Sequence, residues 1–183
     1  MITFDGIQIF MKIKVFLLIS ILSISIIQSI NSQASASSLL EKAKPQAQQE
    51  NKAIFVKFEA SWCGFCHKMT RNMKAETTKQ FFEDNFVVVP LVVFEVPSKK
   101  NLENPGAQDM LREYKAEMAG LPFWVILDAN GKELTSSFYG RRNIGGPTTL
   151  DEVRIFVRKL RKAVPKVSKE DKEAILEQFT TSN

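Results

Sequence analysis

Both cysteines of this 183-residue chain lie in one short stretch, Ser61-Trp62-Cys63-Gly64-Phe65-Cys66-His67. An apolar run over residues 53–58 precedes the stretch, and apolar residues spaced four apart follow it. This pattern predicts a buried strand that leads into a helix, with the cysteines at the junction. Residues three apart on a helix lie about 5 Å apart between Cα atoms, within the roughly 4.4–6.8 Å that a disulfide needs. The stretch therefore predicts a redox-active pair of thiols.

The two cysteines are predicted to have different roles. Cys63 would begin the helix, where unpaired amides and the positive end of the helix dipole favour a thiolate, so it is the candidate nucleophile. Cys66 lies one turn further in and is the candidate resolving thiol, which closes the disulfide and releases the partner. A disulfide across so short a loop stabilises little, because the stabilisation grows with the loop that it closes. Exchange explains the pair better than structural support does.

From about Lys52 to Lys162 the sequence resembles the thioredoxin superfamily. The resemblance rests on Trp62-Cys63-Gly64-x-Cys66 after a buried strand and on Gly120-Leu121-Pro122 before another apolar strand. The chain is most similar to exported thioredoxin-like proteins, including the soluble catalytic domain of the transmembrane disulfide reductases. The resemblance implies an α/β thioredoxin fold, with a central mixed β-sheet of about four to five strands flanked by helices, and a C-terminal helical extension. It also implies a thiol-disulfide oxidoreductase.

The resemblance implies a substrate-binding surface around the cysteines. Pro122 would follow a cis peptide bond and face the cysteine pair, and the backbone of Leu121 would hold an extended substrate by β-augmentation. The alternative is a trans proline that opens an ordinary strand. Gly64 would complete the substrate-binding surface together with nearby aromatic residues. Three aromatic residues are expected to flank the site and to shield Cys66: Trp62, Phe65 and Phe123.

Three ionisable residues are candidates for tuning the cysteine chemistry. His67 would lie in the first turn of the helix, where its cationic form can assist a thiolate; the alternative is an ordinary exposed helix position. Thioredoxins commonly place a buried acid six residues before the first cysteine, where it assists proton transfer to the resolving thiol, and here Lys57 occupies that position. Glu59 shares a strand face with Lys57 and could act as the acid, with Lys57 as its ion partner. The favoured expectation is that both residues reach solvent at an exposed patch.

The dipeptide between the cysteines leaves the direction of electron flow open. Gly64-Phe65 lacks the Pro usual in strongly reducing thioredoxins and the His usual in oxidants and isomerases. Because the relatives that the chain resembles are mostly reductive, we expect it to reduce or isomerise disulfides in protein partners, with oxidation as the reverse reaction. The expected partners are disulfide-containing or dithiol proteins and a membrane-embedded electron donor. No cofactor is expected besides the redox-active disulfide itself.

Three alternative functions follow from the same residues. Cys63-Gly64-Phe65-Cys66-His67 also spells the C-x-x-C-H attachment motif of c-type haem, but the strand before it and the later Gly120-Leu121-Pro122 argue against that hypothesis. A structural zinc site would need carboxylates as ligands, because the chain has one His and no further Cys, so no metal is expected. A non-catalytic module that holds peptides at Leu121-Pro122 is disfavoured by the intact cysteine pair.

Residues 1–36 are predicted to be upstream residues and a secretory signal peptide. Lys12 and Lys14 precede an apolar stretch over residues 15–30, and Ala34-Ser35-Ala36 follows as a small-x-small cleavage pattern. Cleavage is expected after Ala36, giving an exported protein, periplasmic or extracellular, without stable membrane insertion. The alternative is an uncleaved anchor, although an apolar run of about 16 residues is short against the ~20 that a span needs.

The rest of the chain predicts one domain with helical additions at both ends. A polar helical lead-in is expected over residues 37–51, the thioredoxin-like domain over 52–164 and a helical tail over 165–183. Strands are predicted over residues 53–60, 86–96, 123–127 and 133–139, with an Asn-Gly turn over 128–132. Helices are predicted over residues 65–75, 107–114 and 150–164, with a short helical turn at Phe81-Phe82.

The chain has a net charge of +5 at pH 7, and much of the positive charge lies between Arg154 and Lys166. The solvated face of an amphipathic helix explains this cluster, and a patch for an acidic partner or a membrane surface is the alternative. Nucleic acid is not an expected partner, because no aromatic residues alternate with the basic ones.

Overall fold

A computed structural model describes residues 33–164 and 166–181 of the chain. Most of the predicted signal peptide, residues 1–32, lies outside the described residues, as does Pro165. Among the helices of the described part, none has the length and the hydrophobicity that crossing a membrane requires.

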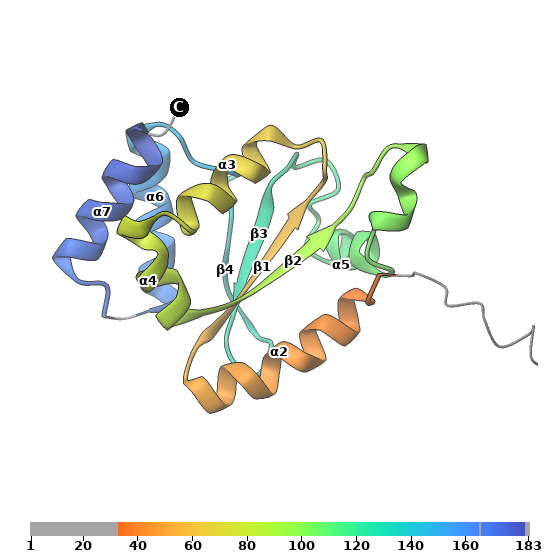
Figure 1. The fold of residues 1–183 in the computed structure, drawn as a ribbon, viewed down its shortest axis with the longest axis horizontal. Coiled ribbons are helices and arrows are strands. Elements are labelled where there is room, and N and C mark those ends of the chain that lie inside the picture. Colours follow the sequence, from red (N-terminus) through yellow and green to blue (C-terminus); the bar gives the residue numbers. More distant parts are fainter. Residues whose placement is uncertain (1–32, 165, 182–183) are drawn as a thin grey trace, which may run out of the picture. The chain divides into compact units, whose positions relative to one another are not determined.

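A four-stranded mixed β-sheet, with the strand order β2-β1-β3-β4, forms the centre of the fold (Figure 1). β1 (Ala53–Glu59) pairs in parallel with β2 (Phe86–Val92) and antiparallel with β3 (Phe123–Leu127), which pairs antiparallel with β4 (Glu133–Ser136). β1 and β3 occupy the centre of the sheet and are buried almost throughout, which explains their continuous apolar sequences. The sheet confirms the predicted thioredoxin fold.

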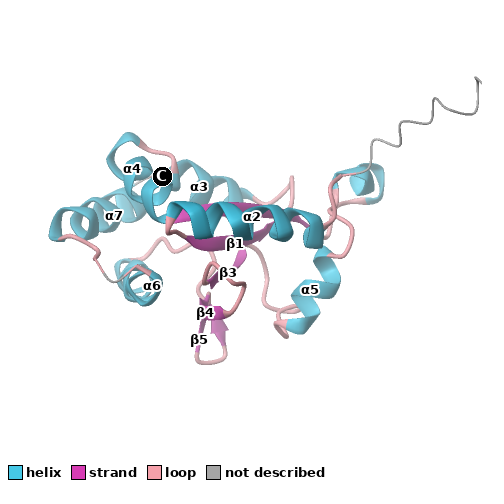
Figure 2. Cartoon of the chain, turned by 90° about the horizontal axis from the view of Figure 1, so that it is seen from below, coloured by secondary structure: helices cyan, strands magenta, loops and turns pink. Residues whose placement is uncertain are grey.

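One face of the sheet is covered by α2 (Ala36–Glu50) and α5 (Ala107–Glu113) (Figure 2). Ala43 and Ala47 of α2 are buried in the same cluster as Ile54 of β1, since small side chains let the helix approach the sheet closely. The predicted polar lead-in is therefore packed against the central sheet.

Four helices cover the opposite face of the sheet: α3 (Gly64–Met73), α4 (Glu76–Asn85), α6 (Leu150–Ala163) and α7 (Lys169–Thr181). Aromatic side chains fill the space between these helices and the sheet. The ring centroid of Phe156 lies 5.3 Å from that of Trp124 on β3 and 5.3 Å from that of Phe179 on α7. Because Phe179 and Ile175 are fully buried, the predicted C-terminal tail is part of the core.

Several element boundaries differ from those predicted. The expected strand over residues 133–139 breaks after Ser136, and β5 (Phe138–Tyr139) forms a separate hairpin with β6 (Arg142–Asn143). The break occurs at Ser137, whose N–H donates to the carbonyl of Trp124 on β3 while its own carbonyl accepts from Ile144. The backbone thus changes its pairing partner at this residue.

The strand predicted over residues 86–96 is also shorter than expected, and it ends at Val92. A 3-10 helix, η1 (Pro97–Leu102), follows in a region where no element was predicted, and α4 is a full helix where only a short turn was expected. Pro90 on the edge strand β2 lies in regular register opposite Lys57 of β1, and its missing backbone donor can face solvent there.

Candidate active site

Cys63 and Cys66 form a disulfide at the start of α3, with their Cα atoms 5.2 Å apart. Cys63 is the N-cap of this helix, and its Sγ accepts a hydrogen bond from the N–H of Cys66 at 3.1 Å. Cys66 is fully buried, whereas Cys63 keeps 4% of its surface exposed. An incoming group can therefore reach Cys63 before Cys66. The capping amide and the helix dipole can stabilise a thiolate at Cys63 once the disulfide is reduced.

Glu95 holds the backbone that leads into the cysteine pair. Its buried carboxylate accepts hydrogen bonds from the N–H of Ser61 and, at 2.9 Å, from the hydroxyl of Ser61. The indole N–H of Trp62 donates to the carbonyl of Phe94 at 2.9 Å, so two successive residues are tied to the segment after β2. Glu95 was not predicted as a site residue, although an acid within the apolar run 86–96 was a usable signal.

His67 is exposed, and its imidazole contacts the same loop. The ring donates from Nε2 to the carbonyl oxygen of Ser61 at 2.9 Å, while the His67 backbone N–H donates to the carbonyl of Cys63 at 3.1 Å. The side chain therefore bridges the first turn of α3 and the loop before it. A role for this ring in tuning the thiolate stays a prediction.

The peptide bond between Leu121 and Pro122 is cis, and the side chain of Leu121 packs against Ala60, Cys63 and Cys66. The structure thus brings the predicted substrate-binding dipeptide against the cysteine pair.

The end of β6 and the loop after it support the turn at Leu121-Pro122. The side-chain Nδ2 of Asn143 lies 3.0–3.1 Å from three carbonyl oxygens of residues 119–122. At Gly146, an added Cβ would lie 3.0 Å from the Phe65 carbonyl and 3.4 Å from Pro122, so any side chain here would require these neighbours to shift by a few tenths of an ångström. Nothing in the local sequence pattern pointed to Asn143 or Gly146, because both act through residues that are distant in sequence.

The expectation that Lys57 and Glu59 form an exposed patch is wrong for Lys57, which is 3% exposed. Lys57 lies on the central strand β1, and α3 covers its side chain. The Lys57 Nζ is 2.6 Å from Glu59 Oε2 and donates a hydrogen bond to the Thr70 hydroxyl on α3. The Thr70 hydroxyl in turn donates to the carbonyl of Cys66 at 3.0 Å. The Lys57–Glu59 ion pair, which was the alternative expectation, is therefore present. It is connected through Thr70 to the backbone carbonyl of Cys66.

The Lys57–Glu59 pair borders a cavity of about 650 Å³. The cavity is also lined by Thr70 of α3 and by Pro90 of the edge strand β2. Glu59 retains 23% exposure of its side chain. The buried ion pair therefore has access to solvent through Glu59 and this cavity.

The three aromatic residues expected around the site separate into two groups. Trp62 and Phe65 are 56% and 60% exposed beside the disulfide, whereas Phe123 is fully buried in the cluster under α2 and α5. The expectation for Phe123 is wrong because successive side chains of a strand point to opposite faces. Its neighbour Trp124 instead faces α3 and donates its indole N–H to the carbonyl of Gly145 at 2.8 Å, in the loop that borders the site.

Within the described residues, no group of three or more His, Cys, Asp and Glu side chains is arranged to hold a metal ion.

The mixed sheet, the disulfide at the start of α3 and the cis Leu121-Pro122 bond together define a thioredoxin-fold thiol-disulfide oxidoreductase. The chain belongs to the thioredoxin-like domain family, which matches residues 40–141. No curated protein matches the sequence significantly.

The solved structures that are similar to the chain include the following three. The disulphide isomerase from Xylella fastidiosa Temecula1 is 18% identical, covers 80% of this chain and 90% of its own, and has a TM-score of 0.49. The DsbH oxidoreductase is 25% identical, with 76% of this chain and 91% of that chain covered and a TM-score of 0.43. A thioredoxin from Thermus thermophilus is 18% identical, with coverages of 73% and 87% and a TM-score of 0.45.

Proposed function

We propose that this protein is an exported thiol-disulfide oxidoreductase that reduces or isomerises disulfides in protein partners. The observation that carries the proposal is that the two sulfurs differ in position and in accessibility. Cys63 caps α3 and is the more accessible sulfur, while Cys66 is enclosed one turn later beside Leu121. This arrangement supports an attacking thiol and a resolving thiol rather than a structural crosslink.

The reduction would proceed through a mixed disulfide. The Cys63 thiolate attacks one sulfur of the substrate disulfide, the substrate S–S bond breaks, and the released substrate thiolate takes up a proton. Cys66, after losing its proton, then attacks Cys63 Sγ and releases the second substrate thiol. Two electrons pass to the substrate, and the Cys63–Cys66 disulfide forms. The same steps in reverse donate a disulfide to a dithiol partner.

The proton of Cys66 must leave during the second step, and the Lys57–Glu59 pair is our candidate for accepting it. The pair contacts Thr70, which is bonded to the Cys66 carbonyl, and it meets solvent through the adjoining cavity. Glu59 would thus act in place of the buried acid that thioredoxins commonly carry, with Lys57 holding it in position.

Substrate would bind in an extended conformation along Leu121-Pro122. The backbone of Leu121 offers its amide and carbonyl to the substrate, and Trp62, Gly64 and Phe65 supply the exposed surface on the other side of the disulfide.

Export and the electron donor are proposed from the N-terminal sequence. The basic residues, the apolar stretch and the small-residue pattern within residues 1–36 support a secretory signal peptide. A reducing enzyme outside the cytosol needs a continuous electron supply, so we propose a membrane-embedded donor that reduces the Cys63–Cys66 disulfide.

Reduction of insulin disulfides tests the proposed activity. Wild-type protein with dithiothreitol should accelerate the reduction, Cys63→Ser should abolish the acceleration, and Cys66→Ser should accumulate a long-lived mixed disulfide visible by non-reducing mass spectrometry. Full activity of Cys63→Ser would refute the proposal. An inactive wild type that absorbs in the Soret region would indicate the haem alternative instead.

The reduction potential of the Cys63–Cys66 couple tests the direction of electron flow. A value near about −270 mV is expected for a reductant, whereas a value near about −120 mV would identify an oxidant and overturn the reductive assignment. Equilibration with glutathione buffers of known ratio, followed by thiol alkylation and mass spectrometry, gives this potential directly.

A further inference from the structure

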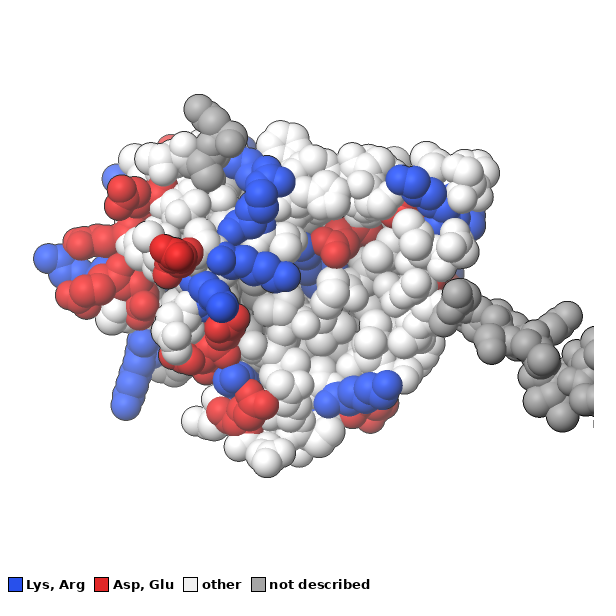
Figure 3. Space-filling view, viewed as in Figure 1, with Lys and Arg blue, Asp and Glu red and all other residues white. Residues whose placement is uncertain are grey.

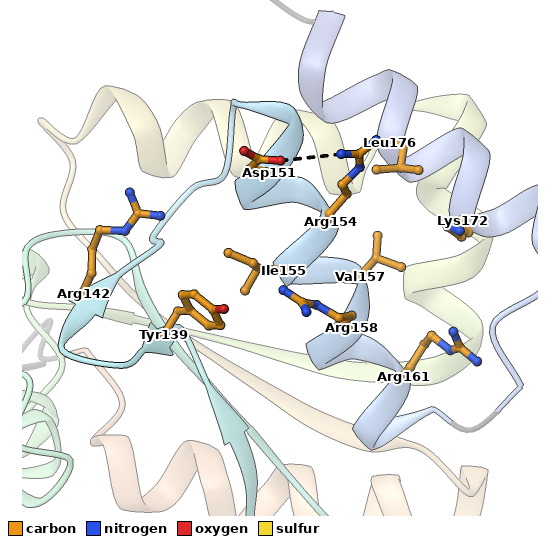
Figure 4. Close-up of a pocket in the computed structure, with 10 residues that line it drawn as sticks. All are labelled: Tyr139, Arg142, Asp151, Arg154, Ile155, Val157, Arg158, Arg161, Lys172 and Leu176. Carbon is orange, nitrogen blue, oxygen red and sulfur yellow. Dashed lines mark ion pairs between the residues drawn. The ribbon is translucent and has the colours of Figure 1, made fainter.

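A basic groove lies between α6, α7 and the β5–β6 hairpin, outside the cysteine site (Figure 4). Its volume is about 710 Å³. One acidic side chain, Asp151, lines the groove together with five basic ones: Arg142, Arg154, Arg158, Arg161 and Lys172. The lining of the groove therefore carries a strong excess of positive charge.

Three of these five cations have no acidic partner among the described residues. Arg154 pairs with Asp151 at 3.6 Å and Arg142 with Glu152 at 3.7 Å, and both pairs are at the surface. Among the described residues Arg158 forms no ion pair, and its guanidinium carbon lies 5.8 Å from the centroid of the Tyr139 ring. Arg158, Arg161 and Lys172 are thus available to an external anion.

The floor of the groove is apolar. Ile155 and Val157 of α6 are buried beneath the arginines, and Leu176 of α7 is partly exposed beside them. A ligand that fills this groove would therefore contact cations at the rim and hydrophobic side chains below, so it should carry both acidic and apolar groups.

The cations are distributed along the groove and do not converge on one point (Figure 4). Arg154, Arg158 and Arg161 follow one side of α6 over seven residues, which corresponds to roughly 10 Å along the helix axis. Such spacing suits several separate negative charges on an extended ligand better than a single phosphate. Four of the five cations are arginines, whose planar guanidinium groups match carboxylates in a two-point geometry.

The face shown in Figure 3 carries both signs of charge, and acidic side chains gather over the end where α4 and α7 lie. The excess of positive charge in the groove lining can select a partner of opposite charge.

The groove connects to the substrate-binding side of the cysteine site through the β5–β6 hairpin. Arg142 at the edge of the groove is followed directly by Asn143, whose Nδ2 lies 3.1 Å from the carbonyl of Pro122. A polypeptide seated in the groove can thus continue toward the Leu121-Pro122 turn.

We propose that this groove binds an acidic segment of the protein whose disulfide or dithiol reacts at Cys63. The proposal rests on the proposed function for its catalytic consequence, while the binding itself requires no redox chemistry. The segment is extended, carries several Asp or Glu residues, and places apolar side chains between them. A flat membrane surface would not reach the floor of the groove.

A binding experiment on the redox-inactive Cys63→Ser/Cys66→Ser protein tests the groove by itself. The probes are two fluorescein-labelled peptides, one of alternating Glu and Leu residues and the other with every Glu replaced by Gln, followed by fluorescence anisotropy. The Glu peptide should bind at least about tenfold more tightly than the Gln peptide, and raising the salt concentration should weaken it.

Charge-reversal variants locate the binding site. Adding Arg158→Glu/Arg161→Glu should remove the preference for the Glu peptide, and Arg158→Lys should retain most of it. Lys162→Glu/Lys166→Glu reverses the same charge at exposed positions outside the groove lining and should leave the preference intact. Equal binding of the two peptides, or equal loss in both double variants, would overturn the proposal. Saturable binding of anionic lipid vesicles or of inorganic phosphate without binding of the Glu peptide would overturn it as well.

Measuring turnover of disulfide peptides distinguishes a failure of the groove proposal from a failure of the proposed redox function. Two disulfide peptides that differ only in an acidic or a Gln-containing extension are compared by kcat/KM in the otherwise wild-type enzyme. The acidic peptide should be favoured about tenfold through KM, and Arg158→Glu/Arg161→Glu should abolish the ratio. Turnover of both peptides without preference refutes the groove alone, whereas absence of turnover with intact peptide binding refutes the redox function alone.

Discussion

At the residue scale, two buried charged groups lie near the cysteines, and each is compensated by a different partner. Glu95 is buried and accepts hydrogen bonds from Ser61, so its carboxylate fixes the loop before Cys63. Lys57 is buried beneath α3 and is neutralised by Glu59, which keeps partial contact with solvent. Lys57 and Glu59 therefore differ in their exposure to solvent, and substituting each of them should change stability by different amounts.

Glu59→Gln should destabilise the protein more than Lys57→Met does. Removing Glu59 leaves a buried ammonium without a counter-ion, which costs on the order of 3 kcal/mol, whereas removing Lys57 leaves a carboxylate that solvent can still reach. Urea unfolding of both variants in the oxidised state measures the free energies of unfolding. The reverse order would show that the ion pair does not stabilise Lys57 in the way described. Under the proposed function, Glu59→Gln should also slow resolution of the mixed disulfide and shift its pH profile.

At the element scale, the active-site helix is supported by helices that follow it much later in the chain. The ring of Phe179 on α7 is tilted against that of Phe82 on α4, with 6.2 Å between the centroids, and Thr77 at the start of α4 donates a hydrogen bond to Gln178 of α7 at 3.0 Å. Lys159 joins α6 to the β5–β6 hairpin by donating a hydrogen bond to the carbonyl of Phe138 at 2.6 Å. These contacts hold α4 against α7, and α6 against the hairpin that borders the basic groove.

Phe179→Ala should lower the free energy of unfolding by about 3–5 kcal/mol, because it leaves a cavity among fully buried aromatic rings. Phe65→Ala is the matched control: it removes the same atoms from a side chain that is 60% exposed, and it should change stability by less than about 0.5 kcal/mol. Chemical denaturation of both variants checks the prediction. A small effect of Phe179→Ala would mean that α7 is not part of the cooperative core. Phe65→Ala should instead reduce binding of protein substrates.

Lys159 should make stability depend on pH in the alkaline range. Burial, followed by repulsion from Lys162, lowers the pKa of Lys159 below its usual value of 10.5. The folded protein therefore binds fewer protons at this residue than the unfolded chain does, so its contribution to stability rises as the pH increases through that interval. Lys159→Met should remove this increase. The free energy of unfolding of the wild type minus that of the variant should therefore rise as the pH increases. A pH-independent difference would contradict the prediction. Taking the difference cancels the contribution of Tyr114, whose raised pKa, caused mainly by burial, acts in the opposite direction.

At the scale of the whole molecule, the described fold includes residues on both sides of the expected cleavage point. Ser35 caps α2 by accepting a hydrogen bond from the N–H of Ser38 at 3.2 Å, and the carbonyl of Ala34 accepts one from Asn104 at 2.8 Å. Ala36 is buried, and its N–H donates to the carbonyl of Pro105 at 2.9 Å. Cleavage after Ala36 would remove all of these contacts from the mature protein.

A protein that begins at Ser37 should therefore be less stable than one that begins at Gln33. Loss of the Ser35 cap alone costs about 1 kcal/mol, and loss of the buried Ala36 adds to it. Thermal unfolding of the two proteins measures the difference, and equal stability would refute a structural role for residues 33–36. The intact mass of protein exported by the producing cell identifies the natural N-terminus and tests the predicted cleavage position.

The sequence predicted the fold well where the signal lay within a few consecutive residues. Apolar runs identified β1 and β3, the Asn130-Gly131 turn joined β3 to β4, and the cysteine spacing placed the disulfide at the start of α3. The sequence was a poor guide to burial, side-chain orientation and strand ends, because these depend on which distant segments pack against a residue. Examples are the burial of Lys57, the orientation of Phe123 and the end of β4 at Ser136.

By itself, the sequence determined the central strands, the main helices and the cysteine pair, because periodicity and spacing are properties of neighbouring residues. The resemblance to the thioredoxin superfamily added the order of the sheet and the Leu121-Pro122 turn. Only the tertiary structure decided which charges are enclosed, that Glu95 and Asn143 support the site, and that α6, α7 and the β5–β6 hairpin together form a basic groove. The physical reason is that burial and electrostatic surroundings arise from contacts between segments far apart in the chain, and no single segment encodes them.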